Sequence, residues 1–337
     1  MTAIERCLII AEAGVNHNGR LDIALDLCDA AKEAGADVVK FQTWNTDKII
    51  TKTVAQADYQ SANTGRSVSQ YEMLKELELS YSDFESIKLH CDDIGITFAS
   101  TADEEDSLDF LTSLGIPFVK IGSGDIGNVP FLRHVGQTGL PVILSTGMSD
   151  MGEVGLSIAA LREGGASDIT LLHCTTSYPC AIESVNMRAM NSLRDGFRLP
   201  VGYSDHTIGC EAAVCAVAFG ATVIEKHFTL DRDMPGPDHV ASTDPRGFKA
   251  FVHAIRNAEA CLGSGVKAPT NEEKEISRVV TKRIVALRDI SAGEELTEEN
   301  VCVKRSNDGM PAKYWDLIVG SRASRSYSEN EGVVICV

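Results

Sequence analysis

The sequence has no apolar run long enough to cross a bilayer as a helix, which takes about eighteen consecutive apolar residues. Its first apolar stretch, Cys7 to Ala11, spans five residues and is followed by Glu12. A secretory signal needs a longer apolar region. We therefore expect a cytoplasmic protein that does not associate with membranes.

Positive charge is also scarce, with 31 Lys and Arg residues against 48 Asp and Glu residues and a net charge of −17. A nucleic acid partner requires a basic surface, so this composition argues against that class of partner. The ten cysteines are scattered and form no C-x-x-C pair. Their spacing indicates reduced thiols rather than the disulfide framework of a short secreted protein.

What the sequence does contain is a repeat of short apolar runs rich in β-branched residues, with helical stretches between them. Helical periodicity is clearest over Leu21–Ala34, Glu104–Leu114, Met151–Arg162 and Pro245–Leu262. The candidate strands are Cys7–Ala11, Asp37–Phe41, Ile96–Ala99, Phe118–Ile121, Pro141–Leu144, Ile169–His173, Leu199–Gly202 and Thr222–Glu225. Eight strands close a parallel α/β barrel, so the sequence predicts a (β/α)8 TIM barrel.

The rest of the chain predicts a linker and a second, smaller domain. Residues 266–281 are rich in glycine, proline and charge, and residues 282–337 read as short strands and turns. We therefore assign residues 1–265 to the barrel. The one long connection, from Trp44 to about Gly95, contains a polar stretch at 56–70 that predicts a loop over the barrel mouth.

Polar residues follow every one of the candidate strands. In a parallel barrel the functional groups lie at the carboxyl ends of the strands. A single serine or threonine at such a place usually caps a helix, but polar groups at all the strand ends indicate a site. The candidates are Glu12 with Asn16, His17 and Asn18, then Lys40, Gln42, Ser100, Thr101, Lys120, Ser123, Ser145, Thr146, His173, Thr175 to Tyr178, Ser204, Asp205, His206, Glu225, Lys226 and His227.

Two kinds of ligand are suggested within this set. His206 and His227 end neighbouring strands, where two imidazoles converge at a spacing that suits a divalent metal. Lys40 and Lys120 end apolar runs, where a buried ammonium group is costly without an anion. The glycine-flanked Ser123 and the Ser145-Thr146-Gly147 turn add hydroxyl and N–H donors that suit a phosphate or carboxylate.

Seven motifs resemble the sialic acid synthase family, in order and spacing, across nearly the whole chain. They are AEAGVNHNG at 11–19, VKFQTW at 39–44, KIGSGD at 120–125, STGM at 145–148, GYSDHT at 202–207, IEKHFTLD at 224–231 and GPDH at 236–239. The tail RIVALRDISAGEELTEENVCVKR is similar to the antifreeze-like (SAF, β-clip) domain that ends these enzymes.

The resemblance implies a metal-dependent transferase that forms a carbon–carbon bond. It would condense phosphoenolpyruvate with an N-acylated aldose, either N-acetylmannosamine or a 2,4-diacetamido-trideoxyhexose, to give a sialic acid-type nonulosonic acid and phosphate. It also implies a domain-swapped homodimer that uses Mn²⁺ or Mg²⁺.

The resemblance further implies a role for each site residue. His206 and His227 would bind the metal, and Glu12 and Glu225 would act beside them in catalysis. The contacts to phosphoenolpyruvate would come from Lys40, Thr101, Lys120, Ser123, Ser145 and Ser204, and those to the sugar from Gln42, Tyr178, Asp238 and Arg305, the last reaching the other subunit's site. Two departures from the family pattern are Thr176, where many members have Asn, and Ala102-Asp103, where many have Pro-Phe.

Three alternatives remain at this stage. Lys120 on a barrel strand suits a Schiff-base aldolase, whose nucleophile is a lysine. A different phosphoenolpyruvate-dependent sugar-acid synthase would use a similar set of residues. A non-catalytic protein could use the barrel as a scaffold and bind its partner with the C-terminal domain.

Overall fold

The computed structural model describes residues 6–56 and 68–334. The chain divides into two compact units, Met1–Ser264 and Gly265–Val337. Each unit has its own hydrophobic core, so the two are described separately. Within the described ranges, no helix is both long and apolar enough to span a bilayer.

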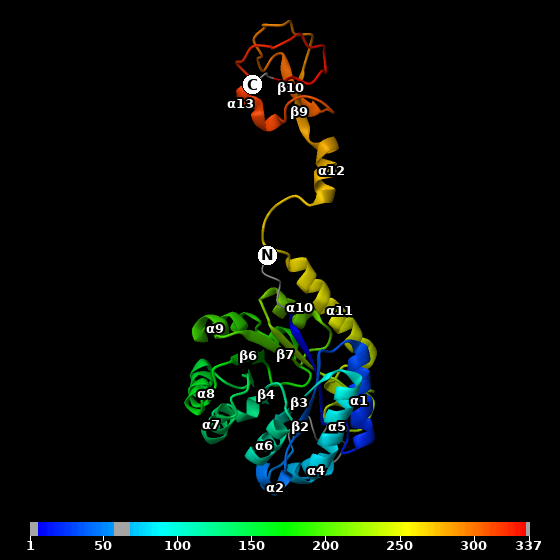
Figure 1. Cartoon of the computed structure of the whole chain (residues 1–337), viewed down its shortest axis with the longest axis vertical. Helices are drawn as coiled ribbons and strands as arrows, with labels where there is room; N and C mark the ends of the chain where they lie inside the picture. The colour runs from blue at the N-terminus through cyan, green and yellow to red at the C-terminus, as the bar shows by residue number, and fades with distance from the viewer. Residues whose placement is uncertain (1–5, 57–67, 335–337) are drawn as a thin grey trace. The chain divides into compact units, whose positions relative to one another are not determined.

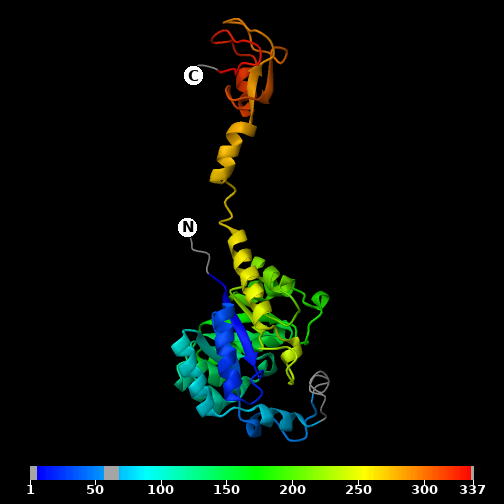
Figure 2. The ribbon, with the colours of Figure 1, turned by 90° about the vertical axis from the view of Figure 1, so that its right-hand side faces the viewer.

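The first unit is a closed parallel barrel ringed by helices (Figure 1, Figure 2). Each strand hydrogen-bonds to the next along the chain, and the last pairs with the first. The prediction of a (β/α)8 barrel is therefore confirmed. The strands are β1 (Leu8–Gly14), β2 (Val38–Thr43), β3 (Thr97–Ala102), β4 (Val119–Ile121), β5 (Val142–Ser145), β6 (Ile169–Cys174), β7 (Val201–Asp205) and β8 (Val223–His227).

Helices connect the strands and pack on the outside of the barrel. Their ends carry the expected local signals: α8, for example, starts with a capping box between Asp150 and Glu153 and stops at Gly165, whose φ is 116°. The helices of this unit are α1 (Leu21–Ala34), α2 (Thr46–Ile49), α4 (Gln70–Leu77), α5 (Tyr81–Ile94), α6 (Glu105–Ser113), α7 (Val129–Gln137), α8 (Met151–Gly164), α9 (Arg188–Phe197), α10 (Glu211–Ala218) and α11 (Pro245–Leu262).

The interior of the barrel is apolar at one level and polar at the next. The apolar plug consists of inward-facing residues from six strands and of the residue that precedes β4: Ile10, Val38, Ala99, Phe118, Ile143, Leu172 and Val223. In β7 the corresponding position is Gly202, where a Cβ atom would lie 2.6 Å from Leu172 Cδ2. Because side chains alternate along a strand, the residue two positions later again faces inward. This rule places seven of the predicted candidates directly above the plug: Glu12, Lys40, Thr101, Lys120, Ser145, Ser204 and Glu225.

The long connection after β2 carries α2, α4 and α5. Its helix α4 contributes Met73 and Leu77 to a small cluster with Val15 and Trp44. This packing ties the connection to the segments that follow β1 and β2. The predicted loop over the barrel mouth falls largely on residues 57–67, which lie outside the described residues.

The second unit contains α12 (Asn271–Val280), the strands β9 (Lys282–Ala286) and β10 (Val301–Arg305), and the short helix α13 (Trp315–Ile318). The two strands pair antiparallel. Its core is formed by Ile284, Ala286, Leu296, Val301 and Val333, among others. The short strands and turns expected here are therefore present.

Candidate active site

The polar level of the barrel opens into a cavity of about 180 Å³ at the carboxyl ends of the strands. Among the strand-end candidates, Thr176 and all those to which the resemblance gives a role line it. The others do not: Asn16, His17, Asn18, Ser100, Thr146, His173, Thr175, Ser177, Asp205 and Lys226. The complete lining is Glu12, Lys40, Gln42, Thr101, Asp103, Lys120, Gly122, Ser123, Gly124, Ser145, Met148, Cys174, Thr176, Tyr178, Ser204, His206, Glu225 and His227. The cavity is thus built by all eight strands or the loops that follow them.

Four buried charges form a chain across the floor of the cavity. Lys40 Nζ contacts Glu12 Oε2 and lies 3.7 Å from Glu225 Oε2, while Lys120 Nζ lies 3.3 Å from Glu225 Oε1. Glu225 also accepts a hydrogen bond of 3.0 Å from Ser204, and Lys40 donates one of 2.8 Å to Thr101. The two ammonium groups are thereby held close together without an excess of buried charge.

The two carboxyl groups differ because their surroundings differ. Burial and the nearby Glu225 raise the pKa of Glu12 to about 7, although Lys40 opposes this shift. Burial would also raise the pKa of Glu225, but Lys120 and Lys40 outweigh it and lower the value to about 2. Glu225 is therefore a permanent anion at neutral pH, whereas Glu12 can gain or lose a proton there.

The two imidazoles lie side by side at the ends of neighbouring strands. The ring centroids of His206 and His227 lie 5.4 Å apart, and the Tyr178 ring lies 4.2 Å and 5.5 Å from them. His206 Nδ1 lies 2.8 Å from the Thr175 carbonyl oxygen, so this nitrogen carries the proton and leaves Nε2 for a ligand. His227 Nδ1 is buried and has no hydrogen-bond partner in residues 6–56 and 68–334.

These features fit the predicted divalent metal. Burial and His206 hold the pKa of His227 well below its usual range, which keeps this ring neutral as a ligand must be. Burial would lower the pKa of His206, but Cys174 and the Thr175 carbonyl raise it. The described part of the chain holds no group of three or more His, Cys, Asp or Glu side chains placed to bind an ion. Two imidazoles alone would make a site that shares its ion with water or substrate.

Hydroxyl groups line the wall opposite the imidazoles. Ser123 Oγ accepts a hydrogen bond of 2.9 Å from the N–H of Gly147, whereas Ser145 Oγ is buried without a partner in the part of the chain described. A Cβ atom on Gly147 would lie 2.3 Å from Thr176 Oγ1 and 2.8 Å from Ser123 Oγ. Glycine is therefore required here for the hydroxyls to converge. Hydroxyl donors that line the same cavity as Lys120 suit an anion.

Two predicted residues do not line the cavity. Asp238 precedes a short turn of helix, and burial raises its pKa to about 6 although the charge of His206 opposes the shift. Arg305 is exposed at the end of β10 in the second unit. Their proposed contacts with the sugar stay predictions. The neighbouring His239 is structural, since its Nδ1 pairs with Thr229 Oγ1 at 2.7 Å.

Sequence reasoning selected Thr176 as a strand-end candidate but did not select Asp103, Met148 or Cys174, which also line the cavity. Cys174 could have been found, because it stands two positions after the inward-facing Leu172 in β6. Asp103 and Thr176 follow the ends of their strands, where the alternation of side chains no longer applies. Asp103 and Thr176 are also the positions where the chain departs from the family pattern.

Asp103 provides a test of the electrostatics of the cavity. Burial and the nearby Asp125 raise its pKa to about 7, although the charge of Lys40 opposes this shift. A carboxyl whose pKa is higher in the folded than in the unfolded protein binds its proton more tightly when folded. Its contribution to stability is therefore lost as the pH rises from about 4 to about 7. Asp103→Asn removes this loss.

We expect the melting temperature of Asp103→Asn to exceed that of the wild type by more at pH 8 than at pH 5, as measured by circular dichroism. Glu12 titrates in the same range but is present in both proteins, so it cancels in the comparison. The exposed Asp233→Asn is the matched control and should show no such change with pH. Equal differences at the two pH values for Asp103→Asn would contradict the burial of this charge.

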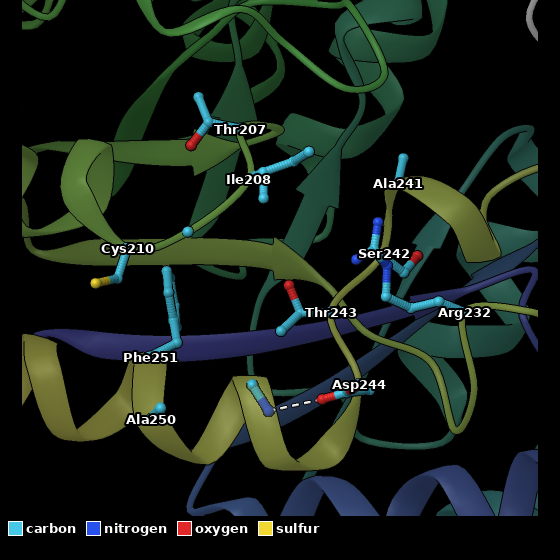
Figure 3. Close-up of a pocket in the computed structure, with 12 residues that line it drawn as sticks. Thr207, Ile208, Cys210, Arg232, Ala241, Ser242, Thr243, Asp244, Ala250 and Phe251 are labelled. Carbon is cyan, nitrogen blue, oxygen red and sulfur yellow. Dashed lines mark hydrogen bonds between the residues drawn. The ribbon is translucent and has the colours of Figure 1, made fainter.

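A second cavity of about 290 Å³ lies outside the barrel, between the loops after β7 and β8 and helix α11 (Figure 3). Its main charged groups are already engaged. Arg232 Nη2 donates to the Val240 carbonyl at 2.7 Å, and Asp244 Oδ1 accepts from Gly247 N at the start of α11, also at 2.7 Å. Its walls include Ile208, Ala250 and Phe251. This cavity therefore lacks the paired ammonium and imidazole groups of the first.

The fold and the inner cavity define a barrel protein whose cavity suits an anionic ligand and acid–base chemistry. Comparison with known proteins gives the family. The NeuB family model matches residues 27–267, and the SAF domain model matches residues 282–334. The chain belongs to the NeuB family and carries a C-terminal SAF domain.

Several named relatives match almost the whole chain. An N,N'-diacetyllegionaminic acid synthase of Legionella pneumophila is 48% identical over 96% of this chain and 92% of its own. A protein of the same name from Campylobacter jejuni is 42% identical, over 97% of this chain and 99% of its own. A pseudaminic acid synthase of Campylobacter jejuni is 34% identical, over 95% of this chain and 93% of its own.

Solved structures agree with this assignment. The crystal structure of a sialic acid synthetase from Leptospira borgpetersenii, in complex with citrate, matches with a TM-score of 0.72 and 32% identity. It covers 81% of this chain and 91% of that one. The relatives are synthases of nonulosonic acids, which places this chain among enzymes.

Proposed function

We propose that the protein joins phosphoenolpyruvate to an N-acylated aldose and releases phosphate, forming a nonulosonic acid. The observation that carries the proposal is the single cavity that holds two ammonium groups, two imidazoles and two unlike carboxyl groups. A condensation between an anion and an aldehyde needs each of these functions at one place.

Phosphoenolpyruvate would bind on the side of the two lysines. Lys40 and Lys120 offer positive charge, and Thr101, Ser123, Ser145 and Ser204 offer hydroxyl donors. Its negative groups would compete with Glu225 for contact with Lys120. An anion that bound near Glu225 without contacting Lys120 would be repelled by that carboxylate. Recognition would therefore depend on the shape of the hydroxyl wall as well as on charge.

The aldehyde would lie beside the imidazoles. The neutral His227 and a deprotonated His206 would hold Mn²⁺ or Mg²⁺, which when bound supplies Lewis-acid polarisation of the aldehyde oxygen. Carbon 3 of phosphoenolpyruvate attacks the aldehyde carbon, water adds at carbon 2, and the carbon–oxygen bond to phosphate breaks. The electron pair of that bond leaves with the phosphate.

The difference between the carboxyl groups separates their roles. Glu12, with its pKa near 7 and a hydrogen bond of 3.0 Å from Gln42, is suited to take a proton from the incoming water. Glu225, bracketed by Lys120 and Lys40, keeps its charge and stabilises the positive charge that develops at carbon 2. The geometry of the two ion pairs supports this division.

The similarities favour one class of acceptor. The relatives named as diacetyllegionaminic acid synthases are 48% and 42% identical to this chain, against 34% for the pseudaminic acid synthase. We therefore propose a 2,4-diacetamido-trideoxyhexose as the acceptor in preference to N-acetylmannosamine.

The proposed dimer supplies Arg305 from a second copy to complete the sugar site. Support comes from α12, on which Ile276, Val279 and Val280 are exposed at 59%, 69% and 43% on neighbouring turns. An apolar stripe of this kind on a charged helix is typical of a face that packs against another chain.

A panel of acceptors tests the proposal. Phosphate released from phosphoenolpyruvate should be fastest, by kcat/KM, with the 2,4-diacetamido-trideoxyhexose and at least about tenfold slower with N-acetylmannosamine, since lost polar contacts in a buried site cost this much. The matching alditols, which lack the aldehyde, are the control and should release none. Equal rates for all aldoses would contradict the acceptor, and no phosphate with any aldose would contradict the reaction.

The Schiff-base alternative makes a different prediction. Lys120 Nζ lies 3.3 Å from Glu225 in a buried ion pair, and this contact holds the nitrogen that would have to attack a carbonyl. We expect chelation to stop turnover and borohydride with substrate to leave the protein unlabelled. Covalent labelling at Lys120 would favour the aldolase instead.

A further inference from the structure

A second pair of buried charges lies directly behind the histidines. Asp205 and Lys226 are 1% and 3% exposed and are the last pair in the ladder between β7 and β8. Because side chains alternate along each strand, both point outward while Ser204, Glu225 and the histidines point into the cavity. This outer pair is not part of the cavity lining.

The two side chains form a closed network with the residue after His206. Lys226 Nζ donates to Asp205 Oδ2 at 2.8 Å and to the Thr207 carbonyl oxygen at 2.7 Å. Asp205 Oδ1 in turn accepts from the N–H of Thr207 at 2.9 Å and from its hydroxyl at 2.8 Å. The ammonium group also lies 5.1 Å from the centre of the Phe251 ring. Figure 3 shows Thr207 and Phe251 on this outer side.

The place of this network in the fold gives it a consequence for the cavity. The backbone ladder between β7 and β8 ends at Asp205 and Lys226, one residue before each histidine. Beyond that point the two segments are anchored to different loops. The His206 carbonyl oxygen accepts a hydrogen bond of 2.8 Å from the N–H of Cys180, and the His227 carbonyl oxygen accepts one of 2.9 Å from the N–H of Thr243. The bond from Lys226 to the Thr207 carbonyl ties the two segments to each other.

We infer that Asp205 and Lys226 are positioning residues that hold the two imidazoles at the separation needed to share one divalent ion. The inference rests on the proposed function, because it presupposes the metal at His206 and His227. A charged pair that is fully hydrogen-bonded and buried permits little movement, which is how groups behind the ligands fix a metal site. Neither residue touches substrate or metal.

The test compares binding of Mn²⁺ alone to the full-length wild type and to Asp205→Asn/Lys226→Met, followed by electron paramagnetic resonance. The double substitution leaves no unpaired buried charge and keeps an oxygen acceptor for Thr207, so it removes mainly the tether. We expect the dissociation constant for Mn²⁺ to rise about ten- to a hundredfold, with a broadened spectrum. The KM for phosphoenolpyruvate should change little, since Lys40 and Lys120 are intact.

Arg256→Met is the matched control. Arg256 also bridges two strands through a partly buried ion pair, with bonds to Asp37 Oδ2 at 2.5 Å and to the Cys7 carbonyl at 2.7 Å, but at the amino ends of β1 and β2. Its loss should lower the melting temperature without changing Mn²⁺ affinity. If the double variant does not fold, Lys226→Met is measured in its place, since it also removes the bond to the Thr207 carbonyl, and it should still weaken Mn²⁺ binding.

The outcomes distinguish the positioning role of Asp205 and Lys226 from the proposed function. Mn²⁺ affinity and a spectrum equal to wild type in a folded variant would overturn the positioning role and leave the proposed function intact. A wild type that releases phosphate but does not bind Mn²⁺ would overturn the metal site, and this inference with it.

Discussion

Replacing His227 by alanine is expected to reduce kcat on the order of 10³-fold or more, because the loss of a metal that polarises the aldehyde removes several kcal/mol of transition-state stabilisation. The reason lies in the site: the ring lies 5.4 Å from that of His206, and its Nδ1 atom is buried and unpaired within the described residues. The measurement is kcat at saturating substrates and Mn²⁺, together with the bound metal content.

The control is a histidine outside the cavity. His90 lies on α5 outside the cavity, with Nε2 2.8 Å from Asp29 Oδ1, and His90→Ala should retain full activity. Circular dichroism should show that both variants are folded. Substantial turnover by metal-stripped His227→Ala would refute the metal role.

Replacing Lys120 by alanine should raise the KM for phosphoenolpyruvate about ten- to a hundredfold, the usual cost of losing a charge-assisted contact. The variant also removes the closest cation to Glu225, at 3.3 Å, and leaves only the more distant Lys40 at 3.7 Å. The pKa of Glu225 should therefore rise towards its ordinary value.

The loss of the ion pair with Glu225 should also lower the stability of the fold at neutral pH. Because the pKa of Glu225 is lower in the folded protein than in the unfolded chain, its ion pairs stabilise the fold above about pH 4.5 and are lost as the pH falls towards 2. Lys120→Ala should therefore melt at a lower temperature at pH 7. The control is Lys88→Ala on α5, which loses only an ion pair with Asp92 on the same helix. It should change neither the KM nor the melting temperature appreciably. An unchanged KM in Lys120→Ala would contradict the proposed anion site.

The barrel could be predicted from the sequence because its strands are short, apolar and evenly spaced. The cavity followed from one further rule, that alternate residues face the same side. Lys40, Glu225 and Ser204 each stand two positions after an inward-facing residue of the plug or its equivalent. This periodicity makes the strand ends of a parallel barrel accessible to sequence reasoning.

The pairing of the charges could not be predicted, because it depends on the stagger between strands. Register places Glu12 beside Lys40 and Ser204 beside Glu225, and these neighbours set which carboxyl group keeps its charge. The position of Asp103 likewise depends on the path of the loop after β3. The sequence alone thus left the roles of Glu12 and Glu225 unseparated, whereas the ion pairs distinguish them.

The role of Arg305 could not be derived from the pattern of residues in the sequence. Its proposed contact with the sugar came from resemblance, since no pattern within one chain reveals a contact made by another copy. The residue is exposed on β10 in its own unit. Its role therefore depends on the dimer, which remains a proposal.

The most direct test of the account follows the atoms of phosphoenolpyruvate labelled with ¹³C in all carbons and with ¹⁸O in the bridging oxygen. With a 2,4-diacetamido-trideoxyhexose and Mn²⁺, mass spectrometry should find every labelled carbon in the new sugar acid and the ¹⁸O in the released phosphate. Retention of the ¹⁸O in the sugar acid, or pyruvate formed without the aldose, would contradict attack of water at carbon 2 in this cavity.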